Sequence, residues 1–394
     1  MARLATLGLL TLGLVAQLDS ARADARAERP ARPTRVPAWL TPELSQWSEV
    51  WGTPARGRRQ IVYTGLLTFG LEANLDAAVG VRGLSVGCTG LWLQGDDLSA
   101  SAVGDAGVTS NIAGVSTVRL FRAWLEQRLH GNVVVIRAGV LSIDDDFLVV
   151  DSADLFTHSG FGTAQTLALN LPSPIYPLGA LGVRLALQPS PAWWVRMGVY
   201  DGSAGNPTVH RYASELVTGV EAGLTFLGEV GHGSAGSDTH LFAGAFFQAG
   251  KVLESSTRGL WGSYLMAETV LARVGGSELS GFAHASTAWP ASRAVAAGYL
   301  DAGLSLGGAL WRRPGDALGL AYGSTLFGRR YVGRRRALGH IATASEDVLE
   351  FTYRAALHPR LALQPVLQWI RDAHYTGRNS LVLGLRLALT LGGS

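Results

Sequence analysis

The sequence predicts an all-β fold, an antiparallel up-and-down barrel that crosses a membrane, and three observations predict it. The composition is 47% hydrophobic and only 16% charged, with 50 glycines among 394 residues. Short segments alternate between apolar and polar side chains, and their connections alternate in length. Because side chains in a strand point alternately to opposite faces, each segment has one apolar and one polar face. In a membrane barrel the apolar face contacts lipid and the polar face lines the lumen.

The first 23 residues have the features of a secretory signal peptide. Arg3 supplies the basic start, residues 4–18 the apolar core, and Ala21-Arg22-Ala23 the cleavage site between small residues. A short membrane anchor is the alternative, although the apolar part is interrupted and too short to span a bilayer. We therefore expect an exported protein in the outer membrane of a Gram-negative cell.

Residues 24–59 differ in composition from the rest of the chain. They are rich in arginine and proline, and proline interrupts both helices and sheet ladders. We expect an irregular periplasmic arm here, with room for a short helix around residues 42–47. A plain tether and an arm that binds anionic lipid or peptidoglycan both fit this composition.

The barrel is predicted over residues 60–394, where fifteen alternating segments follow one another. Most connections alternate between long loops and tight turns, which is typical of a barrel with long extracellular loops and short periplasmic turns. Two periplasmic chain ends require an even number of strands. The barrel should therefore have about sixteen strands, and either residues 40–60 form an irregular closing strand or the barrel has an unusual seam. The predicted segments are 62–75, 83–94, 115–128, 133–142, 179–188, 193–201, 216–227, 239–252, 258–272, 278–289, 294–310, 316–328, 347–357, 360–371 and 380–391.

The alternation is clearest in the last segment. Leucine occupies every odd position from Leu381 to Leu391, whereas Arg386 lies on the opposite face. In the segment 115–128 the same rule places Phe121 on the apolar face. A soluble core would not bury so many charged side chains, because each unpaired ion costs several kcal/mol to desolvate.

Motifs for catalysis are weak in this chain. The pattern GxSxG occurs at residues 83–87 and 303–307, but a nucleophile elbow needs a strand-to-helix turn, and both copies lie in glycine-rich strand patterns. The histidines lack metal-ligand spacing, and the acidic run at residues 144–146 lacks the spacing of a calcium loop. We therefore expect no enzyme activity, no cofactor and no metal. Nucleic acid is not expected as a partner either, because no basic cluster is interleaved with aromatic residues.

The polar face carries side chains suited to a sugar. Sugar hydroxyls both donate and accept hydrogen bonds, and sugar C–H faces rest on aromatic rings. The segment 143–178 is too long for a hairpin, so we expect it to fold inward as a constriction loop; a loop packed over the rim is the alternative. The predicted lumen residues are Arg122, Trp124, Glu126, Arg137, Arg184, Trp194, Arg196, Arg354 and Gln364.

Several stretches follow one another in a fixed order from about Tyr63 to the end of the chain, among them RLFRAWLEQRL, VVIRAGVLSIDDDF, FTHSGFG and LEFTYRAALHPRLALQPVLQWI. Together they make the chain resemble the carbohydrate-selective porin family, the OprB-type outer-membrane porins. The resemblance implies a sixteen-stranded barrel through which sugars diffuse passively, with the loop after IDDDF narrowing the channel. It also implies that Arg137, Asp145, Phe147 and Arg184 match recurrent family positions.

Three features depart from that family. The family has an extra N-terminal strand before the stretch YTG, and here the segment rich in arginine and proline takes its place. The chain ends without a terminal aromatic residue, and the loop 329–346 is strongly basic, which suits contact with lipopolysaccharide or attraction of acidic solutes. We predict a passive, carbohydrate-selective pore for small sugars, surrounded by outer-membrane lipid, with a homo-oligomer as one arrangement. A general or anion-preferring pore is the first alternative. The second is an exported β-rich surface enzyme or binding module.

Overall fold

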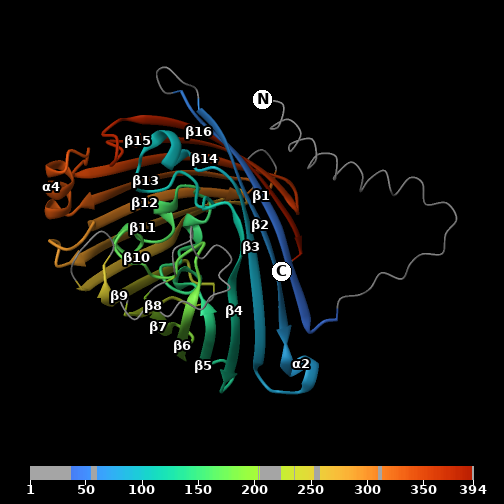
Figure 1. The fold of residues 1–394 in the computed structure, drawn as a ribbon. Coiled ribbons are helices and arrows are strands. Elements are labelled where there is room, and N and C mark those ends of the chain that lie inside the picture. Colours follow the sequence, from blue (N-terminus) through green and yellow to red (C-terminus); the bar gives the residue numbers. More distant parts are fainter. Residues whose placement is uncertain are drawn as a thin grey trace. The chain divides into compact units, whose positions relative to one another are not determined.

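The chain folds into a closed β-barrel. Sixteen antiparallel strands form it in the part of the chain that the structure describes, and β1 pairs with β16 to close the sheet (Figure 1). The predicted up-and-down barrel is confirmed. The predicted signal peptide, residues 1–23, and the first part of the predicted arm lie outside the described residues. The computed structural model describes residues 37–54, 60–202, 204, 223–234, 236–252, 258–308 and 313–392.

Every segment predicted to alternate coincides with a strand, mostly within two residues at each end. The segment predicted at 216–227 differs most, because β8 runs on to His232 before the turn to β9. The strands are β1 (Leu40–Thr53), β2 (Gln60–Asn74), β3 (Leu84–Gly95), β4 (Thr117–Leu129), β5 (Val134–Leu141), β6 (Ala180–Ser190), β7 (Trp193–Asp201), β8 (Leu224–His232), β9 (Thr239–Lys251), β10 (Arg258–Val274), β11 (Ser277–Trp289), β12 (Ala296–Gly308), β13 (Ala317–Phe327), β14 (Ser345–His358), β15 (Leu361–Arg371) and β16 (Ser380–Gly392).

The helical segments are short and belong to the connections between strands. In the described ranges none of them is long and apolar enough to cross a membrane. They are α2 (Leu75–Val79), η1 (Ser99–Val103), η2 (Ile143–Asp145), η3 (Asp151–Ala153), η4 (Ser159–Phe161), α3 (Gln165–Ala168) and α4 (Arg329–Ala337).

Strand β1 corrects the predicted arm, because residues 40–53 form a regular strand. It pairs with β2 along its whole length and with β16 on its other side. Its alternation is hard to read because Trp47 and Trp51 share the inner face with Glu49, so aromatic side chains lie on the polar face. Of the two arrangements that the sequence leaves open, a closing strand is the one found.

The outer face of the barrel is apolar, as the alternation predicts. On β16, Leu381, Leu383 and Leu385 are exposed, whereas Val382 and Arg386 on the other face are buried. Exposed leucines would be unfavourable in water, but they suit hydrocarbon.

Aromatic side chains form a row on the outer face of β8 to β11, at the end of the barrel that carries the long loops. Phe226 pairs with Phe247 and Trp261 pairs with both Phe247 and Trp289 in the strand register. The rings of Phe247 and Trp261 stack at 4.2 Å. Such rows mark the level where a bilayer meets water.

A bulge in β4 moves one predicted outer residue to the inside. The register between β3 and β4 shifts between Thr89 and Gly90. Phe121 consequently lies inside the barrel, buried against Tyr176 with the two rings edge to face at 5.8 Å. A one-residue bulge exchanges the faces for the residues beyond it, and the composition of a single strand does not reveal it.

Two long loops lie inside the barrel, where Figure 1 draws residues 96–116 in teal and residues 143–178 in green. Residues 96–116 and 143–178 meet through backbone hydrogen bonds, from Asn111 N to Thr157 O and from Ser159 N to Val108 O. The second loop, here called the inner loop, buries Ile143 and Phe156 among its contacts with the wall. Of the two predicted arrangements, the structure has the loop folded inward.

Candidate functional site

Four arginines stand side by side on the inner faces of β4 to β7. These are Arg122, Arg137, Arg184 and Arg196, here called the arginine row. The strand register pairs Arg137 directly with Arg184. Because paired residues of antiparallel strands point to the same face, the alternation of each strand brings these guanidinium groups together.

Glu126 on β4 holds the middle of the arginine row. One of its oxygens lies 2.7 Å from Arg137 Nη2 and 3.6 Å from Arg184 Nη2, and the other lies 2.9 Å from Arg128 Nε. Its side chain is only 2% exposed. A buried carboxylate is stable only with partners of opposite charge, and three guanidinium groups supply them here.

The start of the inner loop supplies further partners to the row. Asp145 Oδ1 lies 3.0 Å from Arg122 Nη1, and Asp146 Oδ1 lies 2.8 Å from Arg184 Nη2. The backbone oxygen of Asp146 accepts a hydrogen bond from Arg196 Nη1 at 2.5 Å. The acidic run of the sequence therefore joins the loop to the arginines. In the described ranges no group of three or more His, Cys, Asp or Glu side chains is placed to hold a metal ion.

Burial changes the acidity of the loop carboxyl groups. It raises the pKa of Asp145 to about 7, although the Arg122 charge beside it acts in the opposite direction. Burial also raises the pKa of Asp144, which accepts hydrogen bonds from the Ser142 hydroxyl and from Tyr176 N. The charge of Asp145 therefore changes near neutral pH.

Two tryptophans lie flat against the wall and are covered by arginines. The Arg137 guanidinium lies 4.5 Å from the Trp124 ring centre, and the Arg196 guanidinium lies 4.0 Å from the Trp194 ring centre. Each indole packs on a glycine of the neighbouring strand. The sequence predicts aromatic faces open to a sugar, whereas the structure places cations over these two faces.

The glycines under these rings are required by close approach. A Cβ atom on Gly231 would lie 2.1 Å from the Trp194 ring, and one on Gly87 would lie 2.5 Å from the Trp124 ring. No side chain fits in such a space. Glycine opposite an inward aromatic residue therefore lets the ring lie along the wall and leaves room in the lumen.

Replacing Gly231 by alanine is expected to push the Trp194 ring, together with the Arg196 guanidinium over it, into the lumen. We expect a lower single-channel conductance and a loss of about 1–3 kcal/mol in the free energy of unfolding, the usual cost of overpacking. Planar-bilayer recording and denaturant unfolding measure the two effects. Gly228→Ala is the matched control, because a Cβ atom at Gly228 meets nothing within 4 Å. Equal conductance of the two variants would contradict this role of Gly231.

The structure brings together most of the predicted site residues but places three elsewhere. Phe147 is fully buried and packs edge to face on Tyr200, so it lies in the core of the inner loop. Gln364 is buried too and donates to Leu155 O at 2.7 Å. Arg354 is exposed on the inner face of β14, where its charge lowers the pKa of Asp154 while burial raises that pKa to about 6. The residues brought together are Arg122, Trp124, Glu126, Arg137, Asp145, Arg184, Trp194 and Arg196.

The sequence does not identify the carboxylates that hold the inner loop. Glu350 on β14 accepts hydrogen bonds from the backbone nitrogens of Thr157 and His158, both at 2.8 Å. Glu229 on β8 accepts one from Leu148 N at 3.1 Å, and Glu268 on β10 binds Ser152. Their inward alternation marks them as polar-face residues. Their partners are backbone groups far away in the sequence, which no local pattern reveals.

A model of the family described as carbohydrate-selective porin, OprB family, matches residues 58–251 and 235–391. This chain belongs to the OprB family. The predicted resemblance is confirmed, and with the closed barrel it makes the chain an outer-membrane porin for sugars, a channel rather than an enzyme. No protein of curated function matches the sequence.

Solved porin structures share the fold of this OprB-family chain. The high-pH structure of Pseudomonas putida OprB has a TM-score of 0.80 and 17% identity, over 89% of this chain and 94% of that one. The low-pH structure of the same protein has a TM-score of 0.58 and 15% identity, over 89% and 92%. A mutant of Rh. blastica porin has a TM-score of 0.51 and 8% identity, over 89% and 100%. At these identities the likeness shows the fold alone.

Proposed function

We propose that small neutral sugars diffuse passively through this porin along the arginine row. The observation that supports this route is the pairing of every arginine of the row with a carboxylate on the wall or on the inner loop. Paired charges keep their hydrogen-bonding capacity while their fields largely cancel. Such a surface favours solutes with many hydroxyls over free ions.

Exposure separates the arginines that meet the solute from those that support them. The Arg184 side chain is 7% exposed, whereas Arg122 and Arg196 are 24% and 31% exposed. Arg122 and Arg196 therefore present guanidinium donors to the lumen. The nearly buried Arg184 supports Arg196 through Asp146, whose carboxylate binds Arg184 and whose backbone oxygen binds Arg196, and Asp145 holds Arg122.

An excess of one positive charge when Asp145 is protonated supports an anion-preferring pore as the second candidate, because burial raises the pKa of Asp145 to about 7. Five guanidinium groups, those of the row and Arg128, face five carboxylates, those of Glu43, Glu126, Asp145, Asp146 and Glu229, so the charges balance when all of them are ionised. An excess of one charge attracts anions weakly, and salt screens it. For the pore to prefer sugars, its affinity for a neutral sugar must therefore exceed this attraction for anions.

Replacing Arg196 by glutamine is expected to weaken sugar binding in the pore about threefold to tenfold, because one charge-assisted hydrogen-bond donor is lost. Block of single-channel current by a neutral hexose measures the affinity. Arg273→Gln is the matched control, since Arg273 lies at the exposed end of β10 beside the turn to β11 and pairs with Asp238 and Glu278 rather than with a member of the arginine row or the inner loop. Equal sugar block in the two variants would contradict the role given to Arg196.

Liposome swelling tests the sugar preference itself. The proposed function predicts that a neutral hexose enters faster than the sugar acid of the same size. Equal rates would favour a general pore, and faster entry of the acid would favour the anion-preferring pore.

We further propose that residues 1–23 direct export of the chain and are removed. The composition of this segment supports the proposal. Amino-terminal sequencing of the protein from outer membranes should begin after Ala23.

A further inference from the structure

Helix α4 has one buried face, which fixes its orientation at the barrel mouth. Tyr331 and Val332 are buried and pack in a small apolar cluster with Phe327 of β13. The Tyr331 ring also stacks on His374 at 5.5 Å. A nine-residue helix held along one side presents its other side in a defined direction.

The opposite side of α4 is covered with arginines. Arg329, Arg330, Arg334 and Arg336 are exposed. The Arg334 and Arg335 guanidinium groups each lie 5.9 Å from the Tyr331 ring centre, and Arg336 Nε donates to Ala342 O, so Arg329 and Arg330 are the two that point away from these contacts. Among the described residues, no carboxylate lies within 4.0 Å of the Arg329 or Arg330 guanidinium. Repulsion within such a cluster is relieved when an anion binds to it.

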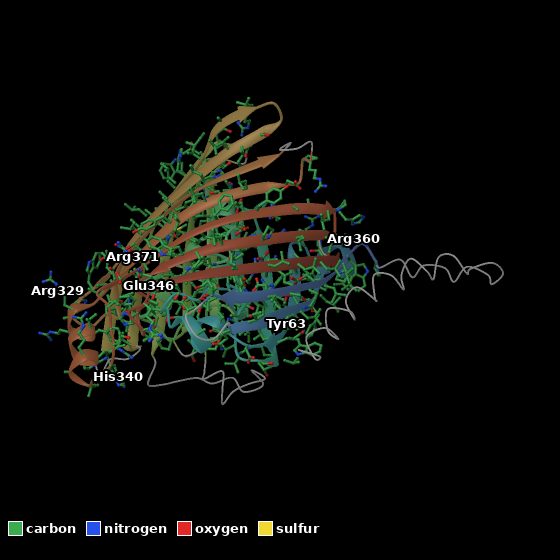
Figure 2. The ribbon with its side chains drawn as sticks, turned by 90° about the horizontal axis from the view of Figure 1, so that it is seen from above. Tyr63, Arg329, His340, Glu346, Arg360 and Arg371 are labelled. Carbon is green, nitrogen blue, oxygen red and sulfur yellow. The ribbon has the colours of Figure 1, made fainter. Side chains whose placement is uncertain are left out.

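The position of α4 in the barrel indicates which compartment it faces. The start of β1 pairs with the end of β16, and the short turns share that end of the barrel, whereas α4 belongs to the opposite, long-loop end. Figure 2 shows Arg329 and His340 at one end of the strands and Arg360 at the other. In outer-membrane barrels the long loops face the exterior, so α4 lies beside the outer leaflet.

Apolar side chains accompany these arginines. Leu338 and Ile341, directly after α4, are 68% and 56% exposed. A soluble anion would gain nothing from them, whereas an amphiphile with phosphate groups and acyl chains would contact both kinds of side chain. The planar guanidinium group also matches phosphate oxygens with two parallel hydrogen bonds.

We propose that the exposed side of α4, together with Leu338 and Ile341, binds the phosphate-bearing headgroup of lipid A, the membrane anchor of lipopolysaccharide. The arginines pair with the sugar-linked phosphates, and the two apolar side chains rest on the uppermost part of the acyl chains. The site lies outside the arginine row, so lipid binding and sugar passage use different residues.

The test compares Arg329→Glu/Arg330→Glu with Arg82→Glu/Arg360→Glu, a control pair of exposed arginines in turns at the opposite end of the barrel. Each purified barrel in detergent is titrated with lipid A and with fully dephosphorylated lipid A, and bound lipid is counted by native mass spectrometry. We expect the wild type and the control pair to bind lipid A alike. The α4 variant should bind it at least tenfold more weakly, and the dephosphorylated lipid should bind weakly to all three proteins.

Two controls separate a loss of lipid binding from misfolding and from the effect of charge reversal. Heat-modifiable gel migration and unchanged single-channel conductance show that the α4 variant is folded, and Arg329→Gln/Arg330→Gln repeats the test without charge reversal. Equal lipid A binding by the α4 variants and the control pair would overturn the proposal. Displacement of bound lipid A by millimolar inorganic phosphate would also overturn the proposal, because it would assign the arginines to soluble anions. A change of oligomeric state without a change in bound lipid would assign this face to a second copy of the chain.

Discussion

Replacing Glu126 by glutamine is expected to lower the free energy of unfolding by about 3–5 kcal/mol, because the change leaves three guanidinium groups without their shared buried carboxylate. The pore should also become clearly anion-preferring, since the change removes one negative charge and leaves the positive charges of the arginine row in excess. Unfolding in urea followed by tryptophan fluorescence measures the stability. The reversal potential across a potassium chloride gradient measures the charge preference.

Glu278→Gln is the matched control for this prediction. Glu278 also pairs with an arginine, Arg273 at 2.9 Å, but both side chains are about half exposed at a turn. Water and salt screen such a pair, so its loss should change neither measurement. If the two variants had the same stability, Glu126 would not be the central carboxylate of the row.

A change of pH is expected to alter the ion preference of the pore with a midpoint near 7. The pKa of Asp145 is raised from its ordinary value near 3.8 to about 7 by burial. Below pH 7 the carboxyl group is neutral and leaves Arg122 with only the more distant Glu43, 3.9 Å away, so anion preference should increase as the pH falls. Reversal potentials at about pH 5.5 and about pH 8.5 measure this change.

The same shift predicts the sign of a stability change. The folded barrel binds a proton at Asp145 more tightly than the unfolded chain does, so this group makes the barrel more stable as the pH falls from about 7 toward about 4. Asp145→Asn removes the titration and should abolish both effects. Persistence of the pH-dependent reversal potential in that variant would assign the effect to another group, with Asp144 and Asp154 as the nearest candidates in the inner loop.

The fold is largely predictable because the alternation within each strand shows which of its side chains face lipid and which face the lumen. Leu381 to Leu391 show the pattern without interruption, and the strands predicted from such patterns were found. Strand β1 was predicted only as one of two arrangements, because Trp47 and Trp51 lie on its inner face and disguise the alternation. Phe121 was misplaced because a bulge depends on the partner strand as well as on the strand that carries it.

The arginine row could be predicted for a related reason, since Arg122, Arg137, Arg184 and Arg196 all follow the inward alternation of adjacent strands. Their carboxylate partners on the inner loop could not be placed, because the path of a long loop depends on contacts distant in sequence. Gln364 shows the limit. Its inward direction follows from the pattern, but the backbone oxygen of Leu155 that it binds is 209 residues away.

The attachments of the inner loop are distributed around much of the barrel wall, from Glu229 on β8 through Glu268 on β10 to Glu350 on β14. The loop thus acts as a cross-brace for the cylinder as well as a restriction of its bore. Deleting the loop to widen the channel would leave the carboxylates of Glu229, Glu268 and Glu350 inside the barrel without the loop N–H groups that donate hydrogen bonds to them. The bore of this porin and the rigidity of its cylinder are therefore linked, and engineering one requires rebuilding the other.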